Sequence, residues 1–144
     1  MAKRTTIENP KALSDYLDRM ETVGSESTLR QAAVAGARVV HKEVRLRAPV
    51  GAKAYERKGA KHTPGTLKRS ILIAYDRENS IEGKLATYLV TWSKDAFYGY
   101  FVEHGTSKAA AHPFLRPGYD AKKQEAVKAM IGVIQEKAKE AARG

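Results

Sequence analysis

The feature that most constrains this chain is a stretch between Phe97 and Gly118 that combines aromatic rings with turn-forming residues. It contains all three phenylalanines of the sequence, together with a carboxylate, two histidines, two prolines and several glycines. Large rings bury much apolar area, and Gly and Pro redirect the backbone at fixed points. The stretch therefore predicts a folded corner against which other elements pack, and not a solvated loop.

Two interpretations of this corner follow from its residue types. In the first it belongs to the core, with the rings and Leu115 buried while Glu103 and His104 satisfy local backbone groups. In the second it presents apolar surface to another subunit, because aromatic and Arg side chains are enriched at the centres of interfaces. Both can hold at once. The candidate interface residues are Phe97, Tyr98, Tyr100, Phe101, Glu103, His112, Phe114, Leu115 and Arg116.

Glu103 lies between large rings and a Gly-Thr turn. A carboxylate in such a place can accept backbone N–H bonds and so lock the corner. Arg116, between Leu115 and Pro117, is its predicted side-chain partner, because a guanidinium offers a planar, bidentate fork.

Two motifs in the chain resemble those of a known family. The string Tyr98-Gly-Tyr-Phe-Val-Glu-His-Gly-Thr, followed by Ala111-His-Pro-Phe-Leu-Arg-Pro, resembles the signature of the gene-product-ten-like morphogenesis proteins of long-tailed phages, which are related to the minor tail protein Z type. An earlier match runs from Ala48-Pro49-Val50 to Gly65-Thr-Leu-Lys-Arg-Ser-Ile, although some fifteen residues separate its two parts and its Gly-Thr order is reversed. Together the two motifs extend the resemblance over roughly residues 29–142.

The remaining chain predicts an α+β fold in a single domain over 1–144. Apolar residues recur at helical spacing in three segments, and they alternate, as in strands, in two others. We expect a small antiparallel β-sheet covered by a long N-terminal-half helix and a C-terminal helix, because so small a sheet needs a helix across one face. The C-terminal helix has Val127, Ile131, Ile134 and Ala138 as its apolar stripe. The predicted segments are an N-terminal helical extension within 1–27, helices over 27–47 and 117–142, and strands within 67–76 and 85–93.

Positive charge is concentrated in one segment. Residues 28–69 carry eleven basic and two acidic side chains, a net charge of +9, out of +10 for the whole chain. Such a local field attracts polyanions, and the alternative is a solvated basic helix face that keeps the protein soluble. Residues 50–66 within this segment are interpreted as a flexible basic loop that becomes ordered on contact with a partner, and the alternative is a tolerated surface insertion. The candidate DNA-facing residues are Lys42, Arg45, Arg47, Lys53, Arg57, Lys58, Lys61, Lys68 and Arg69.

The sequence argues against several other functions. It has no Cys, so neither disulfides nor thiolate metal sites are available, which suits assembly in a reducing host cytoplasm. Its four histidines match no helix-borne ligand pair, and neither a nucleophile elbow nor a phosphate-binding loop is present. No apolar run reaches the ~18 residues of a membrane span. We therefore expect no catalysis, metal, cofactor or membrane partner.

The resemblance implies a structural virion protein at the neck or tail of a phage. We expect a tail-completion component at the head–tail junction, assembled as a homo-oligomeric ring around the DNA channel. Its expected partners are neighbouring head-closure, tail-terminator or tail-tube proteins, with non-specific contact to the genome. The alternative is a free, non-specific nucleic-acid-binding protein, for which the basic segment is the support.

Overall fold

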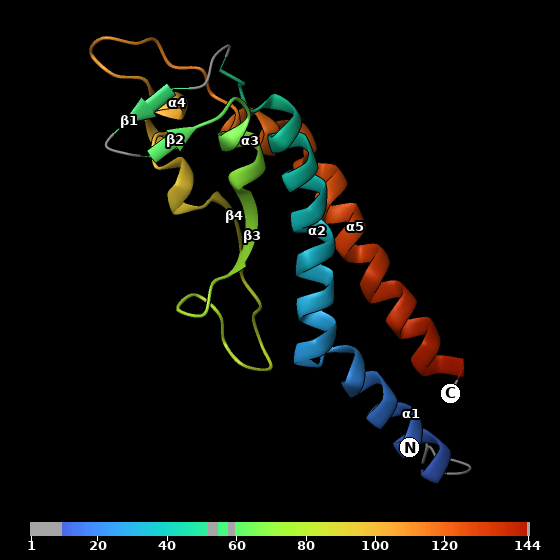
Figure 1. The fold of residues 1–144 in the computed structure, drawn as a ribbon. Helices are drawn as coiled ribbons and strands as arrows, with labels where there is room; N and C mark the ends of the chain where they lie inside the picture. The colour runs from blue at the N-terminus through green and yellow to red at the C-terminus, as the bar shows by residue number, and fades with distance from the viewer. Residues whose placement is uncertain (1–9, 52–54, 58–59, 144) are drawn as a thin grey trace.

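The computed structural model describes residues 10–51, 55–57 and 60–143, and its fold is α+β, as predicted (Figure 1). Two long helices lie side by side, and a two-stranded antiparallel sheet packs against them. The elements in chain order are α1 (Pro10–Val23), α2 (Glu26–Arg47), β1 (Tyr55–Arg57), β2 (Ala60–His62), α3 (Thr66–Ser70), β3 (Ile71–Tyr75), β4 (Tyr88–Trp92), the 3-10 turn η1 (Lys94–Ala96), α4 (Gly99–His104) and α5 (Leu115–Arg143).

Helices α2 and α5 run antiparallel and form the main helix–helix contact of the fold. Two glycines allow their close approach, one on each helix. A Cβ on Gly118 of α5 would come within 2.8 Å of Val44 Cγ2 and 3.2 Å of Val44 Cα. A Cβ on Gly36 of α2 would overlap the side chain of Met130 and lie 3.2 Å from the Ala126 carbonyl oxygen. Larger residues at either position would therefore push the helices apart.

The sheet of β3 and β4 lies against α2. Its register pairs Ile71 with Trp92 and Tyr75 with Tyr88, whose rings have centroids 5.3 Å apart. His41 of α2 fastens the beginning of β3, because its Nε2 lies 2.8 Å from the Ile71 carbonyl oxygen. The ring nitrogen must carry the proton in this bond, since the carbonyl can only accept.

The core lies where α2, α3, β3, η1 and the start of α5 meet. Phe114 and Val44 are the largest side chains that are completely enclosed. The Phe114 ring packs on Trp92 with centroids 5.7 Å apart. The buried cluster consists of Val40, Val44, Ala48, Leu67, Ile71, Ala96, Phe114 and Ala126.

Within the predicted basic loop over 50–66 the structure describes two short antiparallel strands, and the flexibility of the loop stays a prediction. Strands β1 and β2 pair Tyr55 with His62 and Arg57 with Ala60. Strands of three residues are defined by their backbone hydrogen bonds, and the sequence of these two strands has no alternation of apolar and polar residues that would predict them. The sequence signal was Gly59 in the two-residue interval between the strands. The segment 67–76 was predicted as a turn that leads into a strand, and the structure has the single helical turn α3 followed by β3.

The expected apolar stripe of the C-terminal helix is not the side that packs on α2. Ala126 is buried and Met130 meets Gly36, whereas Val127, Ile131 and Ile134 are 40–50% exposed. Because the Gly36 and Gly118 contacts set the rotation of α5, a second apolar stripe remains on its surface.

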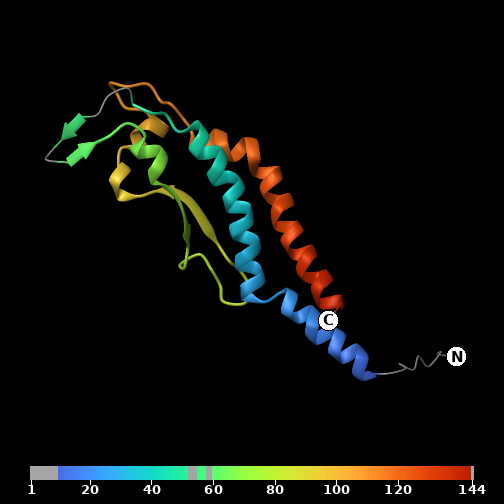
Figure 2. The ribbon, with the colours of Figure 1, turned by 45° about the vertical axis from the view of Figure 1, so that its right-hand side comes forward.

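Helix α1 extends away from the other elements, beside the C-terminal end of α5 (Figure 2). It corresponds to the predicted N-terminal helical extension. Ser25 caps the following helix, since its Oγ accepts a hydrogen bond from the Thr28 N–H at 3.4 Å. Among the described residues, no helix is both long and apolar enough to cross a membrane.

Candidate assembly surface

The aromatic corner begins where β4 passes through η1 into α4. Gly99, the first residue of α4, is buried because it lies directly beneath the indole of Trp92. A Cβ there would come within 2.8 Å of two Trp92 ring carbons and 3.0 Å of Leu67 Cδ1. Glycine therefore lets α4 pack closely on the sheet, while Tyr100, Phe101 and His104 of the same helix are exposed.

Glu103 joins α4 to the start of α5. Its side chain is 7% exposed and accepts three backbone hydrogen bonds. The N–H groups of Phe114 and Leu115 donate to Oε2 at 2.7 and 2.9 Å, and the N–H of Arg116 donates to Oε1 at 3.0 Å. The first N–H groups of a helix have no partner within the helix. Glu103 thus supplies, from eleven residues upstream, the capping group of α5.

The surroundings of Glu103 hold its carboxylate in the charged form. Burial by itself would raise its pKa, but hydrogen bonds from the backbone N–H groups of Arg116, Phe114 and Leu115 outweigh it, with a smaller contribution from the charge of His104. The pKa of Glu103 is therefore below its ordinary value. A carboxylate at a helix N-terminus is also favoured by the helix dipole.

The chain between α4 and α5 is held in one conformation. Gly105 ends α4 at φ +77° and ψ 175°, where a Cβ would lie 2.8 Å from the Ala111 nitrogen. Thr106 closes the next turn, because its Oγ1 accepts hydrogen bonds from the N–H groups of Lys108 and Ala109 at 3.2 and 3.0 Å. The N–H of His112 donates to the Val102 carbonyl at 2.8 Å. The Glu-x-Gly-Thr sequence is therefore a structural unit that fixes the corner.

Three aromatic rings lie on the outside of this corner. Phe97, Tyr100 and Phe101 are 52, 58 and 50% exposed. Phe97 meets Tyr98 edge to face at 5.8 Å between centroids, and Tyr100 meets Phe101 in the same way at 5.9 Å. Tyr100 also lies against the His104 ring at 4.5 Å. We call Phe97, Tyr100 and Phe101 the aromatic patch.

A scan against protein families places these features in a known group. The family model described as "Bacteriophage HK97-gp10, putative tail-component" matches residues 11–105, about two thirds of the chain. The chain belongs to this family. No curated protein and no solved structure matches it.

Membership of the HK97 gp10-like family makes the protein a component of phage tails, and thus of the virion. The family is structural, which implies a role without catalysis. The match begins earlier than the predicted resemblance over 29–142 and ends at Gly105. It therefore includes α1 and Glu103, whereas the residues that Glu103 caps lie beyond it.

The corner divides the nine predicted interface residues of this HK97 gp10-like protein into three groups. Glu103 and Phe114 are enclosed by their own subunit, while Tyr98 and Leu115 are half-buried. The exposed residues are Phe97, Tyr100, Phe101, His112 and Arg116. The core interpretation therefore holds for Glu103 and Phe114, and the interface interpretation stays a prediction for the exposed residues. The expected guanidinium partnership was wrong, because Arg116 contributes its backbone N–H to Glu103.

The predicted DNA-facing residues are not one uniform surface. Lys42 and Arg45 of α2 are exposed, whereas Arg47 is paired with Glu43 at 2.8 Å. Arg69 is fastened to its own turn by the Thr63 hydroxyl at 2.7 Å and the Pro64 carbonyl at 3.1 Å, and Lys68 is half-buried. Lys53 and Lys58, and the side chains of Arg57 and Lys61, lie outside the described residues.

Two supporting residues escaped prediction from the sequence. The contact between Gly99 and the Trp92 ring sets the position of α4. The apolar pattern of the predicted strand that contains Trp92 does not show which residue packs on its ring. The available signal was Gly99 between Tyr98 and Tyr100, because a backbone segment can approach a large ring closely only where the residue has no side chain. Within the part of the chain that the structure describes, no group of three His, Cys, Asp or Glu residues is arranged to hold a metal ion.

Proposed function

We propose that this tail component is a neck or tail-completion subunit at the head–tail junction and assembles as a ring around the DNA channel. The aromatic patch carries this proposal. Phe97, Tyr100 and Phe101 expose about half of their surface on a corner that the Glu103 cap and the Gly105 turn hold in place. In a family of structural tail components, such a surface serves protein–protein contact.

The rigidity of the corner favours binding. Association loses side-chain and loop freedom, and a surface that is already ordered loses less. Aromatic residues supply large contact area with few rotatable bonds and are frequent among the residues that dominate binding energy. Glu103 and Phe114 therefore contribute to assembly from inside, by keeping the patch in position.

Identical subunits that meet through two different surfaces form rings when the rotation closes. The patch provides one such surface. The basic residues Lys42 and Arg45 on α2 provide a surface that faces the genome. These side chains would contact the phosphates of the DNA without sequence preference. Head-closure, tail-terminator or tail-tube proteins are the proposed neighbours above and below the ring.

The first experiment measures the mass of the purified protein by native mass spectrometry and light scattering, at low and high salt. We expect a discrete, salt-resistant oligomer that the double substitution Tyr100→Ser/Phe101→Ser dissociates without changing the circular dichroism spectrum. The matched control is Leu46→Ser, which alters a more exposed apolar side chain, 64% exposed, on α2. A patch variant that assembles normally would count against this interface.

The second experiment places the protein in the particle. A phage lacking the gene should accumulate full heads and separate tails, and a labelled copy should appear at their junction in electron micrographs. The alternative, a free nucleic-acid-binding protein, predicts a monomer that associates with DNA in a steeply salt-dependent manner and is absent from particles.

A further inference from the structure

The first part of α1 exposes an apolar face. Every residue from 10 to 18 is exposed, including Leu13, Tyr16 and Leu17, which are 40, 45 and 57% exposed. These three side chains lie on one face of the helix, and half-buried Met20 continues it toward the body. An isolated helix this short is marginal in water, so an apolar face that is open along nine residues needs an apolar surface to cover it.

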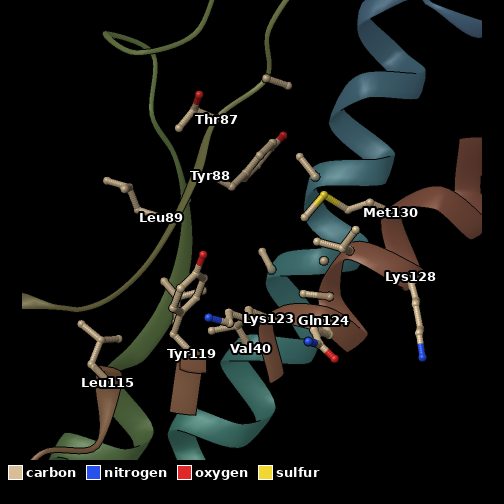
Figure 3. Close-up of a pocket in the computed structure, with 17 residues that line it drawn as sticks. Val40, Thr87, Tyr88, Leu89, Leu115, Tyr119, Lys123, Gln124, Lys128 and Met130 are labelled. Atoms are coloured by element: carbon tan, nitrogen blue, oxygen red, sulfur yellow. The ribbon is translucent and has the colours of Figure 1, made fainter. Parts of the chain in front are cut away.

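A groove of about 840 Å³ lies between β4, α2 and α5 (Figure 3). Its floor is made of small α2 residues, among them Ala33, Gly36 and Ala37. Leu115, Tyr119 and Val127 of α5 form one wall, and the segment 86–90 forms the other. Val127 of the groove shares a face of α5 with exposed Ile131 and Ile134 by helical spacing, so apolar side chains are exposed along α5 beyond the groove.

We propose that α1 of one subunit occupies this groove in the neighbouring subunit. The inference rests on the ring of the proposed function and names a contact that builds it. Donor helix and acceptor groove are different surfaces of the same chain, which is the requirement for a head-to-tail contact that closes into a ring.

Length and charge favour this occupant. A helix of 14 residues is about 21 Å long, and the groove-lining part of α5, from Leu115 to Met130, is about 24 Å long. The groove is lined by two lysines, Lys123 and Lys128, and by no carboxylate. Helix α1 carries three carboxylates and two basic side chains, and its Glu21 is exposed beside the apolar face. The net charges of helix and groove are therefore opposite.

The turn after α1 directs the helix outward. The N–H of Gly24 donates to the Glu21 carbonyl at 3.1 Å, and Ser25 caps α2 through the Thr28 N–H and hydroxyl. The last residues of α1 lie against the C-terminal end of α5. Because these contacts hold α1 away from the groove of its own subunit (Figure 2), a neighbour's groove is the accessible one.

Cross-linking between single-cysteine variants tests the contact directly, because the chain has no Cys of its own. Leu17→Cys, in α1, is mixed with Val127→Cys, in the groove, and the mixture is oxidised under mild conditions. We expect a covalent heterodimer in several-fold excess over the control mixture of Leu17→Cys with Glu136→Cys. Glu136 is exposed on the opposite face of α5 by helical spacing. Equal yields would overturn the proposal, and so would a disulfide that forms within one chain of the Leu17→Cys/Val127→Cys double variant.

The mass of the assembly separates this proposal from the ring itself. Leu17→Asp should dissociate the oligomer, while Ser14→Asp, which adds the same charge at the edge of the apolar face, should leave it intact. A ring that persists with Leu17→Asp overturns the α1 contact and leaves the proposed function standing. A wild-type protein that is monomeric under all conditions overturns both.

Discussion

The Glu103 carboxylate lies 2.7 Å from the backbone nitrogen of Phe114, eleven residues further along the chain. One oxygen of Glu103 thus reaches the residue whose ring is the centre of the core, and both oxygens together cap the longest helix. Removing this side chain therefore affects three elements at once: α4, α5 and the loop between them.

The substitution Glu103→Gln should lower the free energy of unfolding by about 2 kcal/mol, because a neutral amide offers one acceptor oxygen to three N–H groups, of which one is buried and two are partly buried. Urea denaturation measures the difference. The control is Glu125→Gln, which removes an exposed carboxylate from an ion pair with Lys122 and should change stability by at most about 0.5 kcal/mol. Equal effects of the two substitutions would contradict the capping role.

Stability should fall in acid through the same group. The pKa of Glu103 is lower in the folded protein than the value of about 4.3 expected in an unfolded chain. Its contribution is therefore complete above that pH and disappears as the pH falls through the folded-state pKa. Denaturation curves collected between pH 6 and pH 2 should show a shallower decline for Glu103→Gln than for the wild type. Parallel declines would exclude Glu103 as a source of the acid sensitivity.

Two glycines of α5 should respond in opposite directions to the same substitution. Gly118→Ala places a methyl group 2.8 Å from Val44 Cγ2 and 3.2 Å from its Cα, and it should destabilise the protein by about 1–3 kcal/mol. Gly132→Ala meets nothing within 4 Å and should stabilise it by up to about 1 kcal/mol, because Ala is the better helix former. Thermal melts of the two variants provide the comparison. A tolerated Gly118→Ala would mean that α2 and α5 are less closely packed than they are here.

Binding to DNA should depend on Lys42 and Arg45 more than on Arg47, because Arg47 is already paired with Glu43. The double variant Lys42→Ala/Arg45→Ala should reduce the slope of log K against log salt by about 2. Fluorescence anisotropy with a duplex of random sequence measures this slope. Arg47→Ala serves as the comparison, and an equally large reduction per residue would show that pairing with Glu43 does not matter.

Much of the fold was predictable because helical periodicity and the apolar alternation of strands are local signals. The same holds for Glu103, since a carboxylate among large rings needs hydrogen-bond donors. The identity of those donors was not predictable. The Gly105 turn brings the N–H groups of Phe114, Leu115 and Arg116 to Glu103. Almost every residue has a backbone N–H, so the residue types do not show which of these groups will donate.

The sequence by itself determined the helices α1, α2 and α5, the β3–β4 pairing, the family and the residues of the aromatic corner, because each depends on local pattern or a continuous motif. Only the tertiary structure decided which apolar residues are covered. Ala126 of α5 packs on α2, while Val127, Ile131 and Ile134 remain exposed. The physical reason is that the rotation of a helix with two apolar sides is set by the shape of its neighbour, here by the close approach at Gly36 and Gly118.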